Sequence, residues 1–128
     1  MCHQTVSLVA RHLEANGIPT VIMGCARDIV EECGVARFVF TDFPLGNPCG
    51  RPWDLQMQSA IVGCALDLLE RAWMPRTTVQ TPFRWENDRW RDAFMRVDDS
   101  NREALARAGE ERRRKQAEGK SPAPKKSD

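Results

Sequence analysis

The sequence of 128 residues lacks any apolar run close to the ~20 residues that a membrane-spanning helix needs, so we expect no membrane partner. Residues 1–4 have neither the basic start nor the apolar core of a signal peptide, which predicts a cytoplasmic protein. The five cysteines are odd in number and contain no Cys-x-x-Cys pair, which argues against a disulfide framework and against a zinc ribbon. Gly-x-Gly-x-x-Gly and phosphate-loop motifs are missing, and no internal repeat is visible.

The chain also has little net charge, and the charge is unevenly distributed. Nineteen basic and eighteen acidic side chains give +1 overall. Residues 101–128 carry +4, and residues 1–100 therefore carry −3. A mildly acidic body does not offer the basic face that binds nucleic acid, so we expect no nucleic-acid partner.

What is present is a series of short apolar segments separated by turn residues. Apolar spacing predicts a first helix with Val6, Val9, Ala10 and Leu13 turned toward the core. The predicted elements are a helix over 4–16, a strand over 18–23, a helix over 26–33, a strand over 36–41 and a helix over 53–73. Three prolines and two glycines exclude regular structure from residues 42–52, and residues 76–86 are interpreted as an irregular connector.

This order predicts an α/β fold with a partial Rossmann-like parallel sheet, built on a β-α-β unit with a right-handed crossover and covered by helices. Two strands are few for a parallel sheet, so we expect another protein chain, a second copy or a missing N-terminal region to complete it. The predicted organisation is an α/β domain over residues 1–86, a charged amphipathic helical tail over 87–117, and a disordered end over 118–128.

Ligands of open parallel sheets bind beyond the carboxyl ends of the strands, and several reactive side chains are expected there. Cys25 follows the first strand, Asp42 and the loop that contains Cys49 follow the second, and Cys2 and His3 begin the first helix. A helix N-terminus favours the reactive thiolate of Cys2, and His3 could act on it as a base or as a cationic partner.

Each of these residues also has a simpler interpretation. Cys2 could be an exposed thiol at a frayed end, Cys25 could serve packing, and Cys49 could be a small buried residue in a structural turn. A mixed metal site of Cys2, His3, Cys25 and Cys49 would need ligands at very irregular separations, so we expect no metal.

Three segments, Cys2–Val6, Glu14–Val21 and Phe43–Pro48, carry a more specific signal. With them, residues 2–75 resemble the carboxyl-terminal part of the selenoprotein B family of glycine/sarcosine/betaine reductase and D-proline reductase. The resemblance implies a Rossmann-like component of a cytoplasmic reductase complex. That complex would cleave a C–N bond of an amino acid or derivative reductively, with thiol or selenol groups and no further cofactor.

The resemblance also implies roles for residues. The family's reactive selenocysteine or cysteine lies a few residues before the segment that corresponds to Cys2–Gln4. Met1 could follow an upstream UGA codon that was taken for a stop, or the chain could be a genuine small subunit. Cys2 would be the resolving thiol, tuned by His3. An amino-acid-like small molecule would be bound by Asp42, Gly46, Asn47 and Cys49. The alternative is a non-catalytic accessory or scaffold subunit.

Overall fold

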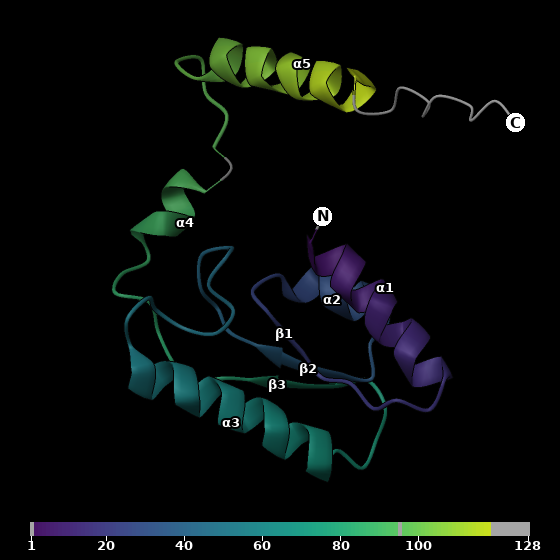
Figure 1. Cartoon of the computed structure of the whole chain (residues 1–128). Coiled ribbons are helices and arrows are strands. Elements are labelled where there is room, and N and C mark those ends of the chain that lie inside the picture. The colour runs from purple at the N-terminus through teal and green to yellow at the C-terminus, as the bar shows by residue number, and fades with distance from the viewer. Residues whose placement is uncertain (1, 95, 119–128) are drawn as a thin grey trace, which may run out of the picture. The chain divides into compact units, whose positions relative to one another are not determined.

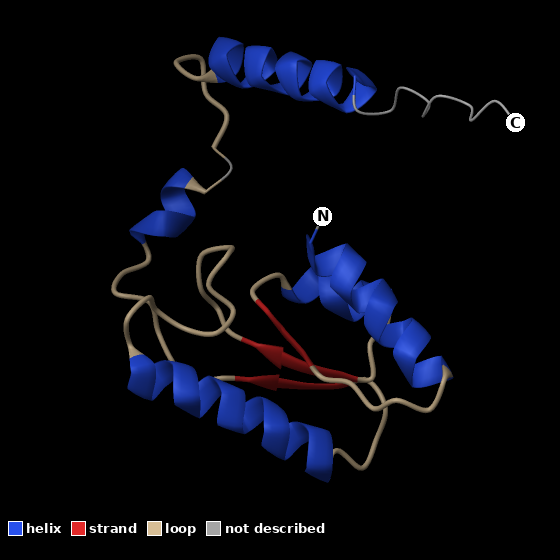
Figure 2. Cartoon of the chain, in the orientation of Figure 1, coloured by secondary structure: helices blue, strands red, loops and turns tan. Residues whose placement is uncertain are grey.

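The computed structural model describes residues 2–94 and 96–118, which fall into two compact units, Met1–Arg91 and Asp92–Asp128. The first unit is a parallel sheet with helices, which confirms the predicted α/β class (Figures 1 and 2). The elements are α1 Cys2–Ala15, β1 Ile22–Gly24, α2 Arg27–Cys33, β2 Arg37–Phe40, α3 Leu55–Arg71, β3 Thr77–Gln80, α4 Arg89–Ala93 and α5 Arg102–Glu118.

The sheet has three parallel strands in the order β1-β2-β3. The third strand was not predicted: the interpretation of residues 76–86 as an irregular connector is wrong for Thr77–Gln80. The β-branched run Thr77, Thr78 and Val79 between two prolines was the available signal. The run is short and only half-buried, so no apolar alternation distinguishes it from a loop.

The two faces of the sheet carry separate cores. Ile22 and Phe38 pair across β1 and β2 and pack with Val30 of α2 on the face that α1 and α2 cover. Val39, the next residue along β2, points to the other face and packs with Leu68 of α3. Figure 1 shows α1 and α2 on one side of the strands and α3 on the other.

The two connections between neighbouring strands run on opposite faces of the sheet. The strands follow one another in sequence order, yet α2 connects β1 to β2 on one face and α3 connects β2 to β3 on the other. Two such crossovers must have opposite hands, so one of them departs from the right-handed rule used in the sequence prediction. Neighbouring connections that leave β1 and β2 toward opposite faces create the crevice in which α/β sheets bind ligands.

The buried face of α1 differs from the expected one. Val6 and Val9 are 44% and 51% exposed, whereas Ser7 and Ala10 are buried, so the expectation that both valines face the core is wrong. Small side chains on the inner face let α1 lie close to α2. The larger apolar residues at helical spacing are therefore left on the outer face.

The segment that joins α1 to β1 is held by a part-buried ion pair. The Glu14 carboxylate accepts hydrogen bonds from the Thr20 backbone N–H and hydroxyl, and its Oε1 lies 2.8 Å from Arg37 Nη1 at the start of β2. Gly17, directly after the predicted helix over 4–16, takes the left-handed conformation (φ 79°) that ends α1. Burial raises the pKa of Glu14, but the Thr20 hydrogen bonds and Arg37 outweigh it and leave that pKa lowered.

Glu14→Gln is expected to lower the free energy of unfolding by about 1–3 kcal/mol at pH 7, because charged hydrogen bonds are lost in a part-buried site. Because its pKa is lowered in the folded protein, Glu14 contributes stability above its unfolded value of about 4.3 and loses it as the pH falls through the folded value. Urea unfolding at several pH values measures both effects. Glu32→Gln, at an exposed position of α2, is the control. Equal losses in the two variants would contradict the structural role.

The second unit is helical and highly charged. Helix α5 has no buried residue and carries exposed pairs such as Glu103–Arg107 and Glu111–Lys115. Instead of one helix over 87–117, the chain forms α4 and α5 with an irregular segment between them, in which Asn101 accepts a hydrogen bond from the Asp98 N–H. The predicted disordered end lies outside the described residues beyond Glu118. No described helix has the length and apolar character to cross a bilayer.

Candidate thiol site at the carboxyl edge of the sheet

His3 links the start of α1 to the end of β1. Its Nε2 accepts a hydrogen bond of 3.2 Å from the Cys25 backbone N–H, and its Nδ1 lies 3.6 Å from the Cys2 sulfur. An imidazole that accepts at Nε2 carries its proton on Nδ1. His3 in this geometry is therefore a neutral donor toward the exposed Cys2 thiol rather than a base that withdraws its proton.

This contact depends on a glycine. A Cβ atom on Gly24 would lie 3.1 Å from His3 Cδ2 and 3.1 Å from Phe38 Cε2. Phe38 is 1% exposed and has no room to move, so the imidazole would have to give way. Gly24 is thus the residue that lets the histidine reach the strand end.

Gly24→Ala is expected to displace His3 and to destabilise the protein by about 1–3 kcal/mol through overpacking. The His3 ring resonances in an NMR spectrum should shift as the Cys25 hydrogen bond weakens. Gly63→Ala is the matched control, because a Cβ there meets nothing within 4 Å and should stabilise α3 by about 0.5–1 kcal/mol. Unchanged His3 resonances in the Gly24 variant would show that the glycine is not needed for the contact.

Cys25 is the half-buried centre of the site. Burial raises the pKa of the Cys25 thiol to about 11, opposed by the backbone N–H groups of Asn47 and Phe43, with Cys49 and Asp42 adding smaller increases. At neutral pH the group is therefore a protonated thiol. The same contacts place the loop after β2 directly against the residue that follows β1.

The loop after β2 owes its shape to an aromatic anchor and two turns. Phe43 is 1% exposed and packs edge-on against Trp85, with ring centroids 5.1 Å apart. The Asn47 backbone and side chain both donate to the Pro44 carbonyl, and the Asn47 carbonyl accepts from Gly50. Gly50 (φ 105°) lies so close to α3 that a Cβ would meet Met57 Cγ at 3.2 Å. The loop is thereby fixed over the end of β1.

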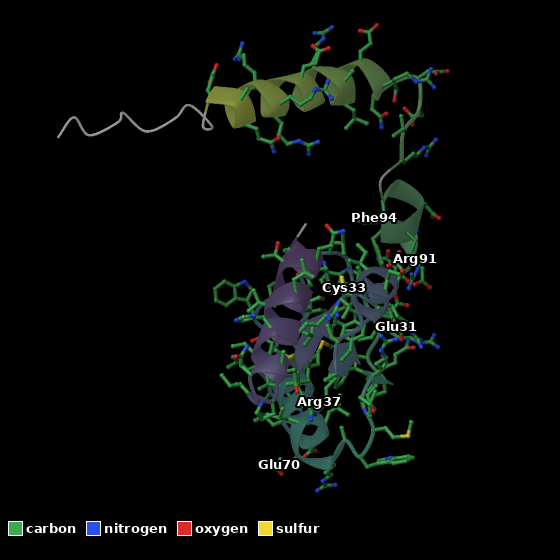
Figure 3. The ribbon with its side chains drawn as sticks, turned by 90° about the vertical axis from the view of Figure 1, so that its right-hand side faces the viewer. Glu31, Cys33, Arg37, Glu70, Arg91 and Phe94 are labelled. Carbon is green, nitrogen blue, oxygen red and sulfur yellow. The ribbon has the colours of Figure 1, made fainter. Side chains whose placement is uncertain are left out.

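Asp42 faces a different part of the same edge. Its carboxylate lies 2.6 Å from Arg91 Nη2, and both line a cavity of about 450 Å³ at the ends of β2 and β3. The other lining residues come from the end of β3 and the segment after it: Gln80, Thr81, Pro82, Phe83, Arg84, Trp85 and Asp88. Figure 3 shows Arg91 and Arg37 toward opposite ends of the first unit, as expected for its carboxyl and amino edges.

The structure therefore brings most of the predicted site residues together. Cys2, His3 and Cys25 are linked through the contacts given above, and the loop that contains Asn47 and Cys49 lies beside Cys25. Gly46 lies in the same loop with a φ of 98° and open space around it. Asp42 borders the group but pairs with Arg91.

Two residues of this edge, Gly24 and Arg91, were missed in the sequence. Gly24 directly follows the predicted strand over 18–23, and nothing local in the sequence indicates that a histidine packs on it. The contact of Arg91 with Asp42 could not be predicted without β3, because the pairing of β3 with β2 brings the segment that contains Arg91 to Asp42. Among the described residues, no three histidine, cysteine or carboxylate side chains are grouped as metal ligands.

Comparison with known proteins gives one informative relative, D-proline reductase subunit gamma from Acetoanaerobium sticklandii, at 32% identity over 85 residues. The chain is a distant homologue of that subunit. The match takes in 66% of this chain but 34% of the relative, so the chain spans about a third of the relative's length. This confirms the D-proline reductase part of the resemblance. No protein-family model matches the sequence, and no solved structure matches the chain.

Proposed function

We propose that this chain is one component of a glycine/sarcosine/betaine or D-proline reductase-type complex, which cleaves a C–N bond of an amino acid or derivative reductively with thiol and selenol groups. The observation that carries the proposal is the connected group of Cys2, His3 and Cys25 at the divergence of β1 and β2, in a homologue of a reductase subunit. Reductive cleavage consumes two electrons and two protons, which two thiols supply on forming a disulfide.

Cys2 is proposed as the resolving thiol. A selenol or thiol outside this chain would carry the first step and end in a mixed selenide-sulfide or disulfide. The Cys2 thiolate would attack its sulfur atom, form a new S–S bond and release the selenolate or thiolate with the bonding electron pair. The neutral His3 ring, 3.6 Å away at Nδ1, would donate a hydrogen bond to the attacking sulfur and hold it in place.

The cavity beside Asp42 is proposed to take the amino-acid-like substrate. A substrate ammonium group suits the Asp42 carboxylate, and a substrate carboxylate suits the Arg91 guanidinium. Asp42 and Arg91 form an ion pair with each other, and a zwitterionic substrate would replace this pair by binding each of its two charged groups to one partner. Gly46, Asn47 and Cys49 would form the border of the site toward the thiols.

Another protein chain is proposed to cover the outer face of α1. Val6, Leu8 and Val9 are exposed there, and β1 pairs only with β2 among the described strands. The relative is itself a subunit, and two thirds of its length have no counterpart in the match. We commit to a partner equivalent to the unmatched part of the relative, which would add a strand beside β1 and an apolar surface over α1.

Val9→Glu should release this chain from the partner, whereas Glu32→Gln on exposed α2 should not.

The test of the function is substrate cleavage by the complex isolated from its native cells. The proposal predicts that removal of this chain abolishes thiol-dependent cleavage of D-proline, glycine, sarcosine or betaine, and that adding back the purified chain restores it. If cleavage proceeds equally well without the chain, the reductase role is wrong.

The alternative is a non-catalytic accessory or scaffold subunit. Two observations favour it: the Cys25 thiol stays protonated at neutral pH, and Asp42 is already paired with Arg91. If the chain is a scaffold, the Cys2→Ser variant should restore cleavage as well as the wild-type chain does. If Cys2 is the resolving thiol, the variant should not restore it, so this comparison separates the two functions.

A further inference from the structure

Helix α3 carries a line of apolar side chains on its outer side, and Figure 1 shows this helix as the outer layer on its side of the sheet. Leu55, Val62 and Leu66 are 75%, 40% and 56% exposed. With Ser59 and the half-buried Leu69 they recur at intervals of four, three, four and three residues. In a helix with 3.6 residues per turn, this spacing keeps all five within about 40° of one line, as in the seam of a coiled coil. These five residues form the α3 seam.

Both ends of α3 have an exposed tryptophan. Trp53, just before the helix, is 96% exposed, and Trp73, two residues beyond its end, is 87% exposed. Trp53, Leu55 and Trp85 line an open groove of about 550 Å³ at the amino end of the helix. Trp53 also has a left-handed backbone (φ 65°), which costs on the order of 1–3 kcal/mol in a residue other than glycine. Its indole buries almost no surface within the described chain, so packing there does not offset this cost.

The α3 seam is symmetric about its middle. Counted from position 64, the seam and Trp73 give three pairs at distances of two, five and nine residues: Val62 with Leu66, Ser59 with Leu69, and Leu55 with Trp73. A two-fold axis at this position therefore sets the seam of one chain against the seam of a second, with the small serine opposite a leucine. Such self-complementarity is what an interface between two identical subunits requires.

We propose that two copies of this chain pair through antiparallel α3 helices, with Trp73 of each copy bound in the groove beside Trp53 of the other. The antiparallel order brings the carboxyl end of one helix to the amino end of the other, where the groove lies. A tryptophan in a pocket is a common anchor of protein interfaces. At roughly 150–250 Å² each, the two tryptophans of one copy supply about half of the ~800 Å² that each partner of a standard interface buries.

Other occupants of the α3 seam fit less well. Helix α5 of the same chain lies wholly within the described residues and has Leu105 as its only large apolar side chain, so it offers no matching apolar face. The reductase partner proposed above covers α1, on the opposite face of the sheet (Figure 1). Glu70 is the charged side chain of α3 nearest the seam, and the antiparallel order sets it opposite the uncharged Gln58 rather than a like charge.

The mass of the purified full-length chain in solution tests the pairing. Sedimentation equilibrium at about 100 μM, above the micromolar Kd of weak interfaces of this size, should give twice the chain mass of 14.5 kDa. Leu66→Glu should weaken the dimer on the order of 100-fold or more, because it places two carboxylates in an apolar contact. Leu8→Glu, at a 58% exposed position of α1, is the matched control and should leave the dimer unchanged. Circular dichroism verifies the fold of both variants.

A photo-cross-linker tests the orientation. With p-benzoylphenylalanine at position 73, the cross-linked dimer should join residues 72–76 of one copy to the peptide that contains Trp53 and Leu55 of the other. A monomer at about 100 μM, a Leu66→Glu dimer as tight as the wild type, loss of the dimer in Leu8→Glu, or links between two copies of residues 72–76 would each overturn the proposal. The readout is the state of this chain alone, so the result is independent of the proposed reductase function.

Discussion

Replacing Phe43 by alanine is expected to lower the free energy of unfolding by about 3–5 kcal/mol, because truncation of a fully buried aromatic side chain removes its contacts and leaves a cavity. This is a large share of the roughly 5–15 kcal/mol that stabilises a typical domain. Phe43 packs with Met57 and Ile61 and lies edge-on to Trp85. Its loss should therefore loosen the loop that covers Cys25 as well as the domain.

Urea unfolding followed by tryptophan fluorescence gives the stability, and alkylation of Cys25 gives the state of the loop. In the wild type, Cys25 should react slowly near pH 8, because a thiol with a pKa of about 11 is ionised in only about one molecule in a thousand. The Phe43 variant should react faster at this position. Leu45→Ala, at a 46% exposed position of the same loop, should change stability by less than about 1 kcal/mol. Similar behaviour of the two variants would show that Phe43 does not anchor the loop.

Replacing Cys2 by serine is expected to reduce cleavage by the complex on the order of 100-fold or more at low external thiol, because serine cannot carry out thiol exchange. High concentrations of an external dithiol should restore part of the rate by substituting for the lost resolving group. The variant should fold normally, since Cys2 is exposed and contributes no buried surface.

The matched control is Cys33→Ser on α2, which should leave cleavage unchanged. Two findings would remove Cys2 from the mechanism: full activity of the Cys2 variant at low thiol, or an equal loss in the Cys33 variant. The first of these would favour the scaffold function instead.

The sequence predicts well those features that depend on local patterns. Proline and glycine content places the irregular loop, and Gly17 and Gly34 mark helix ends that the structure has at those positions. The convergence of Cys2, His3, Cys25 and the loop follows from a general property of parallel sheets, that their strands end at one edge. Predicting this convergence required only the correct order of helices and strands along the chain.

Features that depend on tertiary packing could not be predicted in the same way. Helix α1 buries Ser7 and Ala10 rather than its valines, because close approach to α2 favours small residues over large ones. β3 has little apolar alternation and is recognisable only once β2 offers it a pairing edge. The ion pair between Asp42 and Arg91 joins residues 49 positions apart and depends on that strand.

The account depends most directly on the contact between His3 and Cys2, which the carboxymethylation rate of Cys2 at neutral pH tests. We predict that Cys2 reacts several-fold faster in the folded protein than in the same chain unfolded in urea, because the His3 Nδ1–H donates a hydrogen bond toward its sulfur. In His3→Ala, with the fold verified by circular dichroism, the rate should fall to that of the unfolded chain. Equal rates in folded wild type, folded His3→Ala and unfolded chain would contradict the proposed thiol site.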